Sequence, residues 1–131
     1  MAFQLSQYSY GSPRRRGEGL RIGCTRYLAR GVRKETNAAR DIMDVWLPTL
    51  APSKELLSWI KSREAEDAKI WNAFLKRYRA EMKGTAPRQT IMALAQLAKA
   101  TPISVGCYCR GNQCHRFELE QLIRAAADEK Q

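Results

Sequence analysis

Three of the four cysteines and the only histidine of the chain lie within residues 101–119. These are Cys107, Cys109, Cys114 and His115. A cysteine thiolate can attack an electrophile or bind a metal, and an imidazole can move a proton near neutral pH. Reactive side chains at this density predict a functional site in the stretch, while the residue types alone leave its reaction open.

The local pattern around these residues predicts a strand, a tight turn and a helix. Residues 103–108 form a short apolar run with β-branched members, which is typical of a strand. Residues 110–113 contain a glycine and an asparagine and indicate a turn. From Cys114 onward the apolar residues fall mostly at helical spacing. The positive end of that helix therefore meets the end of the strand, a junction that suits an anion or a thiolate.

A thiol nucleophile is the first chemistry that this junction could support. Cys109 ends the predicted strand, with Arg110, His115 and Arg116 close to it, and each of these features favours the thiolate. The arrangement resembles phosphatase and sulfurtransferase loops, with a spacing from Cys109 to Arg116 one residue longer than in the phosphatase loop. We predict Cys109 and His115 as catalytic residues of a thiol-dependent or redox enzyme. In the alternative interpretation, Cys107 and Cys109 are small buried apolar side chains.

A metal centre is the second chemistry, because three sulfurs and one ring nitrogen are a suitable set for tetrahedral zinc. The spacing argues against it. Cys107 and Cys109 share one face of a strand, no second ligand pair lies elsewhere in the sequence, and adjacent Cys114 and His115 are expected to diverge at the helix start. We therefore expect no metal and no cofactor.

Anion binding is the third chemistry, and it draws on a second stretch of the chain. Residues 20–25 predict a strand, and arginines follow it directly. If this strand runs parallel to 103–108, the two carboxyl ends meet at one edge of the sheet, where open α/β sheets bind ligands. We expect a phosphate, sulfate or nucleotide to bind there. The predicted ligand-binding residues are Arg26, Arg30, Cys114 and Arg116.

Two alternatives to these assignments remain open at the level of sequence. Arg26 could pair with a carboxylate such as Asp41 or Asp44. His115 could be a helix-terminal residue that hydrogen-bonds to the backbone.

The formal net charge of +10 is unevenly distributed. Residues 1–40 carry nine lysines and arginines against two acidic residues. Such an excess attracts phosphates, so a nucleic-acid-binding module that uses Arg14, Arg15 and Arg16 is the alternative function. A solvated basic surface that only keeps the protein soluble explains the charge equally well.

The whole chain, residues 1–131, is expected to form one small α/β domain with a three- to four-stranded, mostly parallel sheet flanked by helices. A basic loop over 10–19 and fraying over 128–131 are expected. Hydrophobic periodicity and turn residues predict strands near 3–7, 20–25, 44–50 and 103–108, and helices near 53–60, 70–83, 87–98 and 114–127.

Targeting signals are not apparent in the sequence. The first ten residues lack a basic stretch followed by an apolar one, and the longest apolar run, residues 91–98, is too short to cross a bilayer. Four cysteines in a chain without a secretory signal are expected to be free thiols. We expect a cytoplasmic protein without a membrane partner.

Several short segments carry a resemblance to a known family. They are Arg21-Ile22, Arg26, Arg30-Gly31-Val32 and Lys34, then Trp46-Leu47, Leu50-Ala51-Pro52-Ser53, Glu55-Leu56, Trp59, Trp71 and Phe74, and finally Arg77-Tyr78-Arg79-Ala80-Glu81 and Cys114-His115-Arg116. From about residue 20 onward the chain resembles the domain of unknown function 488 family. The resemblance implies a compact cytoplasmic α/β domain of bacterial type, and it supplies no activity.

The chain departs from the pattern of that family at three positions. The family usually has an aspartate before the first arginine and a Trp-Pro pair before Arg-Gly. Thr25, Leu28 and Ala29 occupy those positions here. If that aspartate is a catalytic acid or base in relatives, this chain lacks it.

Overall fold

Four parallel strands form the central sheet in the computed structural model, which describes residues 3–28, 41–109 and 113–128. The strands are β1 (Leu5–Ser9), β2 (Leu20–Gly23), β3 (Val45–Trp46) and β4 (Ile103–Cys107). Their order across the sheet is β1-β4-β2-β3, and each neighbouring pair is parallel. The predicted α/β class with a parallel sheet is confirmed.

Strand β4 lies between β1 and β2, and all five of its residues are buried. A strand that is covered on both faces is expected to be apolar along its whole length, as this one largely is. Cys107 pairs in register with Ser9 of β1, and Gly106 pairs with Gly23 of β2. The carboxyl ends of these three strands therefore reach the same edge of the sheet, which for β2 and β4 is what the sequence predicts.

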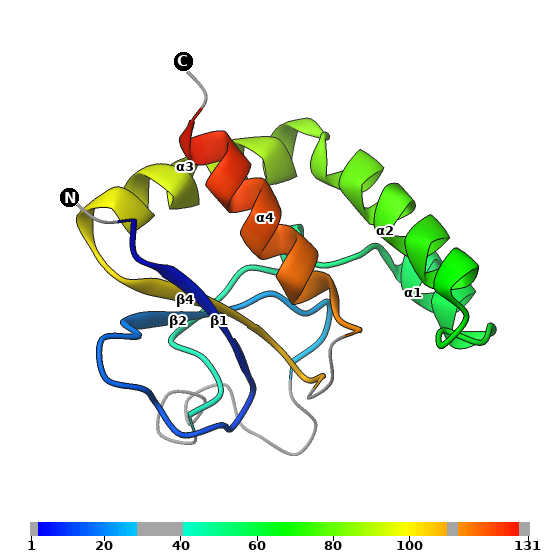
Figure 1. The fold of residues 1–131 in the computed structure, drawn as a ribbon, viewed down its shortest axis with the longest axis horizontal. Coiled ribbons are helices and arrows are strands. Elements are labelled where there is room, and N and C mark those ends of the chain that lie inside the picture. Colours follow the sequence, from blue (N-terminus) through cyan, green and yellow to red (C-terminus); the bar gives the residue numbers. More distant parts are fainter. Residues whose placement is uncertain (1–2, 29–40, 110–112, 129–131) are drawn as a thin grey trace.

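The helices cover one side of this sheet. They are α1 (Lys54–Lys61), α2 (Ala68–Met82), α3 (Thr85–Ala100) and α4 (His115–Ala127), with a short 3₁₀ helix η2 (Pro48–Leu50) before α1. In Figure 1 the helices gather above the strands, and the loop between β1 and β2 lies below them. None of the helices in the described residues is both long and apolar enough to cross a membrane.

Capping residues and one buried tyrosine explain where α1 and α2 begin and how they are held. The Ser53 hydroxyl accepts a hydrogen bond from Leu56 N at 3.1 Å, and the Asp67 carboxylate accepts one from Lys69 N at 2.8 Å. The side chain of Tyr78 on α2 is fully buried, and its hydroxyl donates to the main-chain oxygen of Leu50 at 2.7 Å. This bond fixes α2 over η2.

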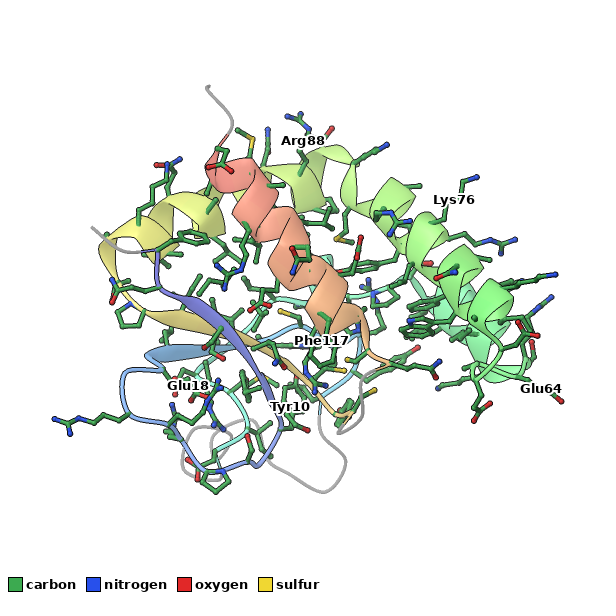
Figure 2. The ribbon with its side chains drawn as sticks, in the orientation of Figure 1. Tyr10, Glu18, Glu64, Lys76, Arg88 and Phe117 are labelled. Atoms are coloured by element: carbon green, nitrogen blue, oxygen red, sulfur yellow. The ribbon has the colours of Figure 1, made fainter. Side chains whose placement is uncertain are left out.

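Among the residues that the structure describes, loops cover the face of the sheet away from α4. Tyr8, Tyr10, Ile42 and Met43 form a small apolar cluster there. Figure 2 shows Tyr10 and Glu18 on this side, opposite α4. Arg21 of β2 is fully buried under these loops, and its guanidinium donates to the main-chain oxygens of Asp41 and Pro13.

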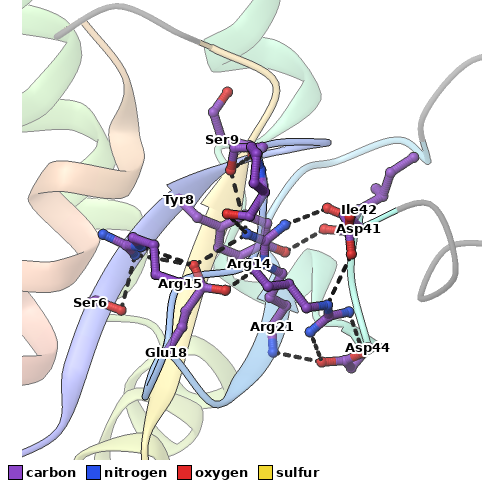
Figure 3. Close-up of polar contacts among 12 residues, drawn as sticks. Ser6, Tyr8, Ser9, Arg14, Arg15, Glu18, Arg21, Asp41, Ile42 and Asp44 are labelled. Atoms are coloured by element: carbon purple, nitrogen blue, oxygen red, sulfur yellow. Dashed lines mark hydrogen bonds and ion pairs between the residues drawn. The ribbon is translucent and has the colours of Figure 1, made fainter.

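Two arginines of the run in the β1–β2 loop, Arg14 and Arg15, are paired with carboxylates. Arg14 binds Asp44 through Nη2 and Oδ1 at 2.9 Å and Asp41 through Nε and Oδ1 at 3.1 Å (Figure 3). Arg15 binds Glu18 at 3.1 Å. Nucleic-acid binding by this run stays a prediction. Part of the positive charge that such binding requires is neutralised by these carboxylates.

The Arg14–Asp44 pair predicts a loss of stability in acid. The hydrogen bond from Arg14 holds the pKa of Asp44 below the ordinary value of 3.8. A carboxylate with a lowered pKa stabilises the fold above the unfolded pKa, and this contribution is lost as the pH falls below about 3.8. Asp44→Asn should lower the free energy of unfolding at pH 7 and flatten its decline in acid, as measured by urea unfolding over a pH series. If the free energy of unfolding of Asp44→Asn fell in acid as steeply as that of the wild type, this prediction would be wrong.

Candidate functional site

Four reactive side chains converge where β4 ends and α4 begins. Cys107 is the last residue of β4, Cys109 follows it, Cys114 is the N-cap of α4 and His115 is its first residue. The Cys107 sulfur lies 3.9 Å from the Cys109 sulfur and 4.0 Å from His115 Nδ1, and the Cys114 sulfur lies 3.9 Å from the same nitrogen. We call the three cysteines together with His115 the thiol–histidine cluster.

His115 is oriented by a contact on the far side of its ring. Its Nε2 lies 2.8 Å from the main-chain oxygen of Cys24, which follows β2. A carbonyl oxygen can only accept, so Nε2 carries the hydrogen and Nδ1 offers its lone pair to the sulfurs. The buried ring also meets the edge of Tyr78, with 5.4 Å between ring centroids. Burial lowers the pKa of His115, so the imidazole is neutral at pH 7.

Protons in the cluster are unequally shared among the three thiols. Hydrogen bonds from Cys107 and then Cys114 lower the pKa of Cys109, and His115 and Arg116 add to this effect. Hydrogen bonds to Cys109 and Cys114, and then burial, raise the pKa of Cys107. For Cys114, the hydrogen bond with Cys107 lowers the pKa, but the bond to Cys109 together with burial outweighs it. A single negative charge in the cluster therefore resides mainly on Cys109.

A cavity of about 310 Å³ opens beside the cluster. It lies at the carboxyl ends of β2 and β4 and is walled by α1, α2 and the β4–α4 connection. Its lining is mostly apolar and aromatic, and Trp71 and Phe74 stack within it at 4.8 Å between centroids. Arg26 and Lys61 are its cations among the described residues. We call this space the site cavity. Its other lining residues are Thr25, Tyr27, Pro52, Leu57, Ile60, Cys107, Tyr108, Cys109, Gln113, Cys114 and His115.

The predicted arginines occupy different surroundings. Arg26 lines the site cavity together with His115, and its guanidinium donates to the main-chain oxygens of Pro52 and Ala51, both at 3.1 Å. These contacts join the loop after β2 to the start of α1. The alternative in which Arg26 pairs with Asp41 or Asp44 is not seen, because Arg14 binds both carboxylates.

Arg116 is buried and does not line the cavity. Its Nε donates to Gln7 Oε1 at 2.6 Å, and its Nη1 donates to the main-chain oxygen of Cys109. Ser9 Oγ donates to the same oxygen at 2.9 Å. Arg116 therefore holds the main chain of Cys109 in place and acts as a positioning residue. Arg30 lies outside the described residues.

A sequence model described as the active DUF488-N3 subclade matches residues 5–127. The chain belongs to the DUF488 family. No curated protein and no solved structure matches it.

The segments that carry the DUF488 resemblance bind each other beside the cluster. The Leu50-Ala51-Pro52-Ser53 segment supplies the oxygens that accept from Arg26 and from Tyr78. Its Ser53 also donates from N to Glu81 Oε1 at 2.9 Å. Thr25, which stands where the family usually has an aspartate, is buried and lies 2.7 Å from the Tyr10 hydroxyl.

One expectation about this DUF488 site is wrong. Cys114 and His115 were expected to diverge, yet their reactive atoms lie 3.9 Å apart. The reason is the backbone at the cap: Cys114 is extended, with φ −151° and ψ 142°, while His115 is already helical. The change in direction between them turns both side chains to the same side. The alternative in which His115 hydrogen-bonds to the backbone is seen, through Cys24.

Sequence reasoning missed part of the cavity wall. The helical spacing of Trp71 and Phe74 predicts that they belong to the core, and Phe74 is indeed buried, but both also line the cavity. Tyr108 reaches across it, since its hydroxyl donates to the main-chain oxygen of Tyr27 at 2.8 Å. A tyrosine between two cysteines at a strand end was the available signal for Tyr108.

Proposed function

We propose that this DUF488 protein is a cytoplasmic enzyme that binds a small ligand with a planar ring and an anionic group, such as a nucleotide, and modifies it through Cys109. The observation that carries the proposal is an aromatic cavity with a cysteine cluster in its wall and lysine and arginine beside it. Its volume is at the lower end of the range for small-molecule sites. Four free thiols support a reducing compartment.

The walls of the site cavity suit the ring of such a ligand. Trp71 and Phe74 present aromatic surface from α2, and Tyr27 and Tyr108 add more from the strand ends. Stacking between an aromatic side chain and a planar ring is favourable and tolerates different rings. Lys61 on α1 supplies a mobile cation for an anionic group.

Cys109 is the cluster member best placed to react, because it is the only one of the cluster cysteines with an exposed side chain. Its main chain is held by Ser9 and Arg116, which keeps the sulfur at the cavity wall. In the proposed step the Cys109 sulfur forms a bond to an electrophilic carbon of the ligand. The bond from that carbon to its leaving group breaks, and the leaving group keeps the electron pair.

Adenosine monophosphate tests the binding half of the proposal. At a concentration well above its Kd it should raise the Tm by several degrees, because a ligand that binds only the folded state stabilises it. Lys61→Ala should remove most of this shift. Lys76→Ala is the matched control, since Lys76 projects from the outer side of α2 (Figure 2) and does not line the cavity. No shift with adenosine monophosphate, phosphate or sulfate would end the proposal.

Alkylation tests the thiol half. Iodoacetamide should modify Cys109 at least about tenfold faster than Cys24, whose side chain is fully buried. Bound adenosine monophosphate should slow the reaction at Cys109, and Cys109→Ala should remove the fast phase. Peptide mass spectrometry measures both rates. Equal rates for the two cysteines would show that Cys109 is not the reactive group.

A further inference from the structure

The thiol–histidine cluster has the donor chemistry of a zinc site. Three thiol sulfurs and one neutral ring nitrogen form a soft set with the number of ligands that tetrahedral zinc takes. The reactive atoms of Cys107, Cys114 and His115 all lie within 4.8 Å of one another. Cys109 adds a third sulfur at 3.9 Å from Cys107. The ligands that a metal requires are therefore already assembled.

The distances within the cluster fit one central ion. Zinc binds sulfur at about 2.3 Å and nitrogen at about 2.0 Å, so a tetrahedron places two sulfurs about 3.8 Å apart and a sulfur and a nitrogen about 3.5 Å apart. The sulfurs of Cys107 and Cys109 are 3.9 Å apart, and His115 Nδ1 is 4.0 Å from Cys107 and 3.9 Å from Cys114. The atoms of Cys107, Cys114 and His115 already lie close to this spacing, and Cys109 approaches the group from the Cys107 side.

The outer face of His115 is arranged as it is in metal sites. A metal-binding histidine usually donates its other N–H to a carbonyl or a carboxylate, which fixes both its tautomer and its direction. His115 Nε2 lies 2.8 Å from the main-chain oxygen of Cys24, and Nδ1 faces the sulfurs. Tyr78 packs against the ring and limits its rotation.

We propose that Cys107, Cys109, Cys114 and His115 bind one zinc ion between the end of β4 and the first turn of α4. All four ligands line the site cavity, and Cys109 is the exposed one among the three cysteines. The set carries one net negative charge when zinc is bound, and the positive end of α4 together with Arg116 lies beside it. The zinc site shares Cys109 with the proposed function, so the alkylation rates given above apply to the metal-free chain. Metal content tests the zinc site separately, because it is measured without any ligand or reaction.

Metal analysis of the purified full chain tests the proposal. Protein prepared under reducing conditions should contain about one zinc per chain. The single variants Cys107→Ser, Cys114→Ser and His115→Gln should each lower the zinc affinity by more than about tenfold. Cys24→Ala is the matched control: it removes a nearby buried thiol and keeps the main-chain oxygen that holds His115, so its zinc content should be unchanged. Equal zinc loss in Cys24→Ala would overturn the assignment.

Cobalt substitution keeps the proposal testable if a variant fails to fold. Cobalt added to the metal-free wild-type chain should give the intense visible bands of a tetrahedral ion and a sulfur-to-cobalt charge-transfer band in the near ultraviolet. Cys109→Ser should weaken the charge-transfer band and keep the tetrahedral bands. A wild-type spectrum of octahedral cobalt without charge transfer would overturn the site. An unchanged charge-transfer band in Cys109→Ser would remove Cys109 from the ligand set.

Discussion

Glu18→Gln should lower the free energy of unfolding by about 3–5 kcal/mol, because it leaves a buried arginine without its counter-ion. Glu18 and Arg21 bind through Oε2 and Nε at 2.7 Å, and the side chains are 1% and 0% exposed. Glutamine keeps the shape of the glutamate and removes its charge. Urea unfolding followed by circular dichroism measures the change.

The surroundings of Arg21 explain why the loss is expected to be large. Its Nη1 donates to the main-chain oxygen of Asp41 at 2.5 Å, and its Nη2 donates to that of Pro13 at 3.2 Å. The guanidinium carbon lies 4.2 Å from the centroid of the Tyr8 ring (Figure 3). These partners fix the direction of the guanidinium, and Glu18 is the carboxylate that forms an ion pair with it among the described residues.

Arg15→Gln is the matched control, since Arg15 binds the same carboxylate from the surface. Its contact with Glu18 is 3.1 Å, but its side chain is 57% exposed. An exposed pair contributes little, so the change should be below about 1 kcal/mol. A Glu18→Gln variant that lost no more stability than Arg15→Gln would show that water, and not Glu18, solvates Arg21.

The burial of Arg21 marks a limit of prediction from sequence. Alternation along β2 predicts Arg21 on the face opposite Ile22, and a charged residue in a strand normally indicates that this face is solvated. Arg21 is instead fully buried. Here the β1–β2 loop returns over that face and brings Glu18 with it. Periodicity within a strand carries no information on which loop covers it, so the pair could not be found from the pattern alone.

For the candidate site, the sequence likewise predicts the location but not the directions of the side chains. The sequence predicts two strands over 20–25 and 103–108, and a parallel arrangement of the two places the loop after β2 near the start of α4, as the structure has it. The directions of individual side chains depend on backbone angles at single residues. The extended Cys114 aims its sulfur at His115, and the helical Arg116 sends its guanidinium to Gln7 and Cys109, away from the cavity. Spacing alone fixes neither direction.

Gly19→Ala should lower the free energy of unfolding by more than about 4 kcal/mol, a loss seen only for severe local conflicts. Gly19 has a φ of 80°, and a Cβ there would lie 2.0 Å from the main-chain oxygen of Pro102. That oxygen accepts a hydrogen bond from Leu20 N at 3.2 Å, at the first paired position of β2 and β4. Because the obstacle is backbone, the clash is relieved only by parting the two strands.

Gly17→Ala separates the steric conflict from the backbone preference. Gly17 has nearly the same φ, 79°, but a Cβ there meets nothing within 4 Å. Gly17→Ala should lower the free energy of unfolding only by the penalty for a non-glycine residue in the left-handed region, about 1–2 kcal/mol. Urea unfolding of both variants measures the difference, which isolates the contact with Pro102. Equal losses in the two variants would mean that the strands part at this end without cost. In that case the β2–β4 pairing, which carries the Cys24 oxygen to His115, would have to be held from the Gly23 and Gly106 end alone.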